Sequence, residues 1–129
     1  MMNKKELEQF EQLLEQRGYR VCESSFKDCE YYWYKPFGQS EYSRDERSNY
    51  MVMFCIYDFH RYAISNPLFR ESPFTTATYV MVSRTVDERM DLLLPNFGNV
   101  PDVEWVEQKA ESFFEWSKNN IKVQKEEEA

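Results

Sequence analysis

Four residues of the types that bind zinc occur in the first half of the chain: Cys22, Cys29, Cys55 and His60. Four thiolate and imidazole ligands are enough to complete a tetrahedral structural zinc site. The ligands of such sites usually come in pairs with roughly two to four residues between them. Here six residues separate Cys22 from Cys29, and Cys55 and His60 fall on opposite faces of a regular strand. We therefore expect no metal, no cofactor, and three reduced cysteines that pack as small apolar side chains.

A second candidate for chemistry is the pair Asp58 and His60, at the end of an apolar run. A carboxylate on the same strand face can orient an imidazole for general base catalysis, and His60 is the only histidine in the sequence. The sequence contains no Gly-x-Ser-x-Gly elbow, no phosphate-binding glycine loop and no His-Glu-x-x-His motif to accompany the pair. A solvated strand end is the favoured interpretation, and a hydrolase-like site at these two residues is the less favoured alternative.

The overall composition and net charge of the chain exclude some classes of binding partner. The chain has 129 residues and a formal net charge of -7, with 42% hydrophobic residues. We expect one domain over residues 1–129, and the acidic balance argues against nucleic acid because phosphate binding requires clustered Lys and Arg. Charges interrupt the first ten residues, and no run of about 18 apolar residues occurs. We therefore expect a cytoplasmic protein that binds neither nucleic acid nor a membrane.

Hydrophobic spacing predicts a helix, then a series of strands, then a second helix. Asn3 and Glu6 match a capping box before the first helix, and Pro101 and Asp102 mark the start of the second. The expected helices cover residues 4–17 and 101–119, and the expected strands cover residues 19–26, 30–36, 50–62, 75–86 and 90–94. The last two strands could instead form a single bent strand with a bulge. Residues 122–129 are expected to be a frayed acidic tail.

This order predicts the α+β class. An N-terminal helix, an antiparallel meander of four to five strands and a C-terminal helix are expected, with both helices packed on one sheet face. The first helix should bury the apolar stripe Leu7, Phe10, Leu13 and Leu14. The second should bury Val103, Val106, Ala110, Phe113, Phe114 and Ser117, with Trp105 and Trp116 on its flank.

Residues 50–62 predict a central strand, because both of its alternating faces are apolar for most of its length. Two helices can cover one side of such a sheet but hardly both, so the other side would offer apolar surface to a partner. The sequence does not decide which side the helices take. If the odd-numbered side is uncovered, the predicted interaction residues are Met51, Met53, Tyr57, Phe59, Tyr79 and Met81, with Leu68 and Phe69 as contacts from the loop over residues 64–74.

We therefore expect a non-enzymatic module that binds protein, forms a homodimer, and uses this sheet face or the loop over residues 64–74. The first alternative is a small-ligand-binding domain, which predicts a sizeable apolar pocket between the sheet and the helices. The hydrolase-like site at Asp58 and His60 is the second. The sequence identifies neither the partner nor the ligand nor the biological process.

Overall fold

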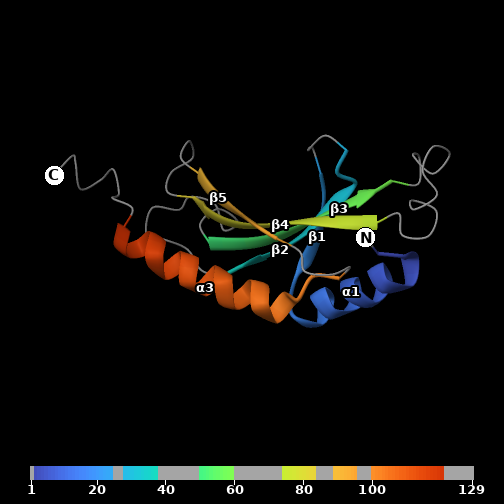
Figure 1. The fold of residues 1–129 in the computed structure, drawn as a ribbon, viewed down its shortest axis with the longest axis horizontal. Coiled ribbons are helices and arrows are strands. Elements are labelled where there is room, and N and C mark those ends of the chain that lie inside the picture. Colours follow the sequence, from blue (N-terminus) through green and yellow to red (C-terminus); the bar gives the residue numbers. More distant parts are fainter. Residues whose placement is uncertain are drawn as a thin grey trace.

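A computed structural model describes residues 2–24, 28–37, 50–59, 74–83, 89–95 and 100–120 of the chain. Two helices flank five strands in the order of the sequence (Figure 1). The elements are α1 (Lys4–Gln16), β1 (Arg20–Glu23), β2 (Tyr31–Pro36), β3 (Tyr50–Asp58), β4 (Phe74–Ser83), β5 (Arg89–Leu94) and α3 (Val103–Asn120). The predicted α+β class and the predicted element order are confirmed. The expected loop over residues 37–49 and the expected tail over residues 122–129 lie almost wholly outside the described residues.

The five strands form one antiparallel sheet with the order β1-β2-β3-β4-β5, so each strand pairs with its neighbour in the sequence. Phe54 at the centre of β3 lies opposite Trp33 of β2 and Thr78 of β4. β5 pairs with β4 as a separate antiparallel strand, with Leu92 opposite Val80. The last two strands are therefore not one bent strand, and the sheet has five strands where four to five were expected.

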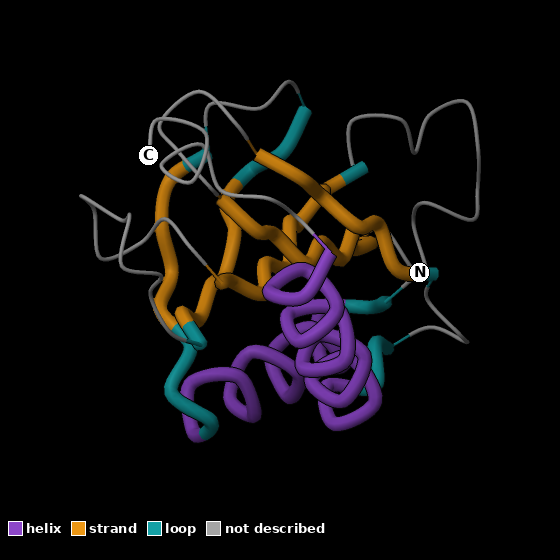
Figure 2. Tube along the Cα trace, turned by 90° about the vertical axis from the view of Figure 1, so that its left-hand side faces the viewer, coloured by secondary structure: helices purple, strands orange, loops and turns teal. Residues whose placement is uncertain are grey.

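Both helices lie on the same side of the sheet (Figure 2), and their side chains pack against the even-numbered residues of β3. Val52, Phe54 and Ile56 are fully buried there, because alternate residues of a strand point to the same face. The helical side chains in this core are Leu7, Phe10 and Leu14 from α1 and Val103, Val106, Ala110 and Phe114 from α3. The structure thus settles the question that the sequence left open, and the odd-numbered face of β3 lies away from the helices.

Helix α1 begins and ends with local hydrogen bonds that its sequence supplies. The Asn3 side chain accepts from the Glu6 amide at 2.8 Å and the Glu6 side chain accepts from the Asn3 amide at 3.1 Å, which is the predicted capping box. Gly18 follows the helix with a φ of 90°, a conformation that other residues rarely adopt. Leu13 is 41% exposed, so the prediction that it belongs to the buried stripe is wrong: it lies at the edge of the stripe, beside the buried Leu14.

Helix α3 begins after Asp102, whose Oδ1 accepts from the Trp105 amide at 3.1 Å. Its buried face matches the predicted one except for Phe113, which is half-buried. Ser117 is buried because its hydroxyl donates to the Phe114 carbonyl oxygen at 2.7 Å. Neither helix is long and apolar enough, in the part of the chain that the structure describes, to cross a membrane.

Candidate interaction surface

The sheet face away from the helices holds a second apolar cluster. Met51, Met53 and Cys55 of β3 pack there with Met81 of β4 and with Cys29. The tyrosines Tyr32, Tyr34, Tyr57 and Tyr79 surround these residues together with Ala77. The structure therefore brings together five of the eight residues predicted for interaction: Met51, Met53, Tyr57, Tyr79 and Met81. A sixth, Phe59, stacks on Tyr57 with 6.2 Å between ring centroids, and Leu68 and Phe69 lie outside the described residues.

The centre of this second cluster is not open surface. Met51, Met53 and Met81 are buried within the single chain, whereas Tyr57, Phe59 and Tyr79 are half-buried. Burial, followed by the proximity of Cys55 and Cys29, raises the pKa of Tyr57 to about 12. Tyr57 therefore stays neutral at physiological pH. The side chains of this cluster that a partner can reach are the half-buried aromatic ones, Tyr57, Phe59 and Tyr79, not the methionines that the sequence suggested.

The residues considered for metal binding or catalysis are only partly described. Cys22, Cys29 and Cys55 form no disulfide bond, and the Cys29 thiol donates to the Tyr31 carbonyl oxygen at 3.3 Å. Within the described ranges, no group of three or more His, Cys, Asp and Glu side chains is arranged to hold a metal ion. Asp58 is half-buried at the end of β3, opposite Phe74. His60 lies outside the described residues, so its pairing with Asp58 stays a prediction.

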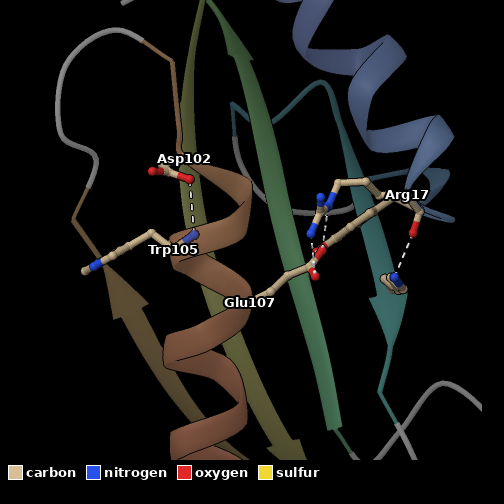
Figure 3. A network of polar contacts seen from close by, with 6 residues as sticks. Arg17, Asp102, Trp105 and Glu107 are labelled. Atoms are coloured by element: carbon tan, nitrogen blue, oxygen red, sulfur yellow. Dashed lines mark hydrogen bonds and ion pairs between the residues drawn. The ribbon is translucent and has the colours of Figure 1, made fainter.

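A polar network connects the end of α1 to α3 (Figure 3). Arg17 donates to both carboxylate oxygens of Glu107, from Nε at 3.1 Å and from Nη2 at 3.0 Å. The Tyr19 hydroxyl donates to the same carboxylate at 3.1 Å. Lys35 of β2 donates to the Arg17 carbonyl oxygen at 2.7 Å, and its ammonium group lies 5.6 Å from the centroid of the Tyr19 ring. Each of these contacts joins the segment after α1 to α3 or to β2, so the network connects the end of α1 with the other helix and with the sheet.

The network shifts the pKa values of its members. Burial alone would raise the pKa of Glu107, but the hydrogen bonds from Arg17 and Tyr19 outweigh it and hold that pKa below its ordinary value of 4.5. The same hydrogen bond to Glu107 raises the pKa of Arg17. Burial is the main cause of a raised pKa at Tyr19, and the Glu107 carboxylate adds to it. These shifts favour an ionised Glu107 carboxylate, a charged Arg17 guanidinium and a neutral Tyr19 phenol. Groups held in fixed ionisation states in this way suit a structural role.

These shifts predict how stability depends on pH. Because the pKa of Glu107 is lower in the folded state than in the unfolded state, its contribution is present above pH 4.5 and is lost as the pH falls through the folded-state value. Wild type should be more stable than Glu107→Gln at pH 7, and the difference should shrink below pH 4.5. Urea unfolding of both proteins from pH 7 to pH 3 measures this, and a difference that is constant across the range would contradict it.

Helix α3 carries two unlike flanks. Glu104, Glu107, Glu111 and Glu115 recur every three or four residues on one flank, the one that reaches Arg17. Trp105, Lys109, Phe113 and Trp116 follow the other flank at the same spacing. Phe113 and Trp116 stack with 5.9 Å between ring centroids, and the Lys109 ammonium lies 5.7 Å from the Trp105 ring. In Figure 3, Trp105 points to the side of α3 that faces away from α1.

The aromatic flank of α3 lies on the side of the sheet that ends in β5. Met90 and Leu92 of β5 point to the helix-bearing face. They lie opposite Val82 and Val80, which belong to the core between the sheet and the helices. Leu93 points to the other face, opposite Tyr79. We call the combination of Met90, Leu92 and Leu93 with Trp105, Phe113 and Trp116 the β5–α3 surface.

The β5–α3 surface is the most exposed apolar region among the described residues. Leu93 is 60% exposed, Trp116 48%, Met90 38% and Leu92 36%. Five of the seven exposed large hydrophobic residues lie between residues 90 and 116, and the other two, Leu13 and Val21, lie on α1 and β1. Sequence reasoning did not select this surface. Two features of the sequence could have indicated it. The strand expected over residues 90–94 is the last of the meander and therefore an edge strand, and two tryptophans lie on the flank of the second helix.

The chain matches no family model, no curated protein and no solved structure.

Proposed function

We propose that this protein is a non-enzymatic interaction module that works by binding another protein chain. The main support is the β5–α3 surface, where Met90 and Leu92 on one side of β5, Leu93 on its other side, and Trp116 on α3 are each exposed. Single exposed apolar residues are ordinary, but a group of them on adjoining elements is typical of interaction sites. Burying a fully exposed side chain of this kind contributes about 1.5–3 kcal/mol, so covering the exposed parts of these side chains would stabilise a complex.

The sheet face away from the helices is the second surface in this proposal. Tyr57, Phe59 and Tyr79 are half-buried on it, and Tyr79 lies opposite Leu93 of β5. Tyrosine suits an interface because it combines a large apolar ring with a polar hydroxyl group. Leu68 and Phe69 stay predicted contacts of the loop over residues 64–74. The β5–α3 surface takes precedence over this face, since the methionines at the centre of the face are already buried.

The alternative functions have less support. A small ligand between the sheet and the helices would need space there, but ring pairs fill the middle of that layer. Phe10 meets Phe54 with 5.3 Å between ring centroids, and Tyr50 meets Phe114 with 5.2 Å. For the hydrolase-like alternative, Asp58 at the end of β3 gives no new support.

Native mass spectrometry of the protein, purified gently and without refolding from its source cells, tests the proposed function. We expect a mass above the 15.7 kDa of one chain that corresponds to a dimer or to a complex with another protein. The Trp116→Glu variant should lose part of this complex, whereas Glu115→Gln, on the opposite flank, should keep it. A bare monomer that carries only the added mass of a small molecule would contradict the proposal.

A further inference from the structure

We infer that the partner of the β5–α3 surface is a second copy of this chain, joined to the first through β5. The two five-stranded sheets would then form one continuous antiparallel sheet of ten strands across a twofold axis. This inference rests on the proposed function and names the partner for its main surface.

The two edge strands of the described sheet differ in how well they resist pairing. Natural edge strands are protected by shortness and by charged side chains. β1 has four residues and carries Arg20 and Glu23 at its two ends. β5 has six residues, of which four in the sequence Arg-Met-Asp-Leu-Leu-Leu are large and apolar. β5 is therefore the edge at which a further strand would pair.

Pairing of β5 with its own copy is geometrically self-consistent. An antiparallel pair of identical edge strands is related by a twofold axis perpendicular to the sheet, which is the symmetry of a closed dimer. This axis keeps the helices of both copies on the same side. The even-numbered residues of β5 in the two copies then meet on the helix-bearing side of the joined sheet, and the two aromatic flanks of α3 face each other.

The sequence of β5 selects one register for this pairing. The twofold axis pairs even residues with even ones and odd with odd, because opposed residues share a face. Only registers centred on Asp91 or Leu92 oppose five residues of β5 from each copy. Centring on Asp91 places two carboxylates directly opposite each other, which is unfavourable. Centring on Leu92 opposes Leu92 with its copy and Met90 with Leu94, so the helix-bearing side becomes wholly apolar.

The charge distribution favours a second copy at this surface. The chain as a whole carries a net charge of -7, which opposes association of two copies in most orientations. On β5, Arg89 and Asp91 balance each other in formal charge, and the aromatic flank of α3 adds only Lys109. The acids of α3 lie on its other flank, with Glu107 directed at Arg17. Two copies can therefore approach through this surface with less repulsion than elsewhere on the helix.

Strand pairing alone gives a small contact, so the helical flank must contribute. A strand of this length spans about 20 Å, whereas a stable interface usually buries about 800 Å² on each partner. Aromatic side chains bury about 150–250 Å² each, and Trp116 and Phe113 lie on the flank that would face the axis. The dimer should therefore depend on Trp116 as well as on Leu92.

Disulfide trapping in the full chain tests the interface and its register together. In the proposed register, the Cα atoms of Leu92 and its copy lie about 4.5–5.5 Å apart, within the range that a disulfide spans. Leu92→Cys should therefore form a covalent dimer of twice 15.7 kDa under mild oxidation. Met90→Cys should not, because its copy lies about 14 Å away along the paired strands. Wild type controls for the three native thiols, and Val21→Cys controls for the β1 edge.

A crosslink through Val21→Cys or Met90→Cys in place of Leu92→Cys would overturn the proposed pairing. A second variant, Leu93→Glu, adds a charge to the exposed edge without entering the core. In the proposed register it places this carboxylate opposite Asp91 of the other copy, so sedimentation should show that it converts the dimer to monomer. A wild-type chain that stays monomeric at the highest soluble concentration would overturn self-association. If that monomer still binds another protein in native mass spectrometry, the proposed function stands without it; if it binds none, both fail.

Discussion

Replacing Phe54 by alanine should lower the free energy of unfolding by about 3–5 kcal/mol, the range found for large-to-small changes at buried aromatic residues. Phe54 is fully buried at the centre of β3. Its ring lies 5.3 Å from that of Phe10 and 5.6 Å from that of Tyr19, measured between centroids. The substitution thus removes the side chain on which α1, the segment after it and the sheet converge. Urea unfolding followed by circular dichroism measures the change.

The matched control for this prediction is Leu13→Ala. Leu13 is 41% exposed, and a substitution at such a position usually changes stability by about 0.5 kcal/mol or less. A loss below about 1 kcal/mol for Phe54→Ala, or equal losses for the two variants, would show that Phe54 is not at the centre of the core.

Replacing Glu107 by alanine should cost about 1.5–3 kcal/mol, the usual range for hydrogen bonds to charged groups. The change removes the acceptor of two Arg17 hydrogen bonds and leaves the hydroxyl of the buried Tyr19 without this partner. It also removes the ion pair that links α3 to the end of α1. The loss is measured by chemical unfolding at pH 7, where the Glu107 carboxylate is ionised.

Glu111→Ala is the control for the Glu107 variant, because Glu111 lies one turn further along the same flank of α3 and is exposed. Its replacement should change stability by about 0.5 kcal/mol or less. Equal losses for Glu107→Ala and Glu111→Ala would mean that helix propensity, and not the contact with Arg17 and Tyr19, sets the effect.

Local sequence signals predicted the elements of this fold well. The capping box at Asn3 and Glu6 and the start of α3 at Asp102 are each encoded within a few residues. The contact of Arg17 with Glu107 joins residues 90 positions apart and has no such signal. The side taken by the helices was also undetermined, because β3 is apolar at both its even and its odd positions.

The candidate surface was predicted only in part. The sequence placed Met51, Met53 and Met81 on one face, and the structure agrees, but sequence periodicity does not report how deeply a face is buried. Conversely, Met90 and Leu92 were expected in a strand, and their exposure follows from the position of β5 at the end of the described sheet. Burial of a strand depends on its neighbours in space, which a single sequence does not specify.

The most direct test of the proposed β5 interface is hydrogen–deuterium exchange of its backbone amides as the protein concentration is raised. If β5 pairs with a second copy, amides within Arg89–Leu94 should exchange more slowly at high concentration than at low concentration, while those of Arg20–Glu23 in β1 should be unaffected. Exchange in β5 that is independent of concentration, in a sample that sedimentation shows to be dimeric, would place the interface elsewhere and contradict the account.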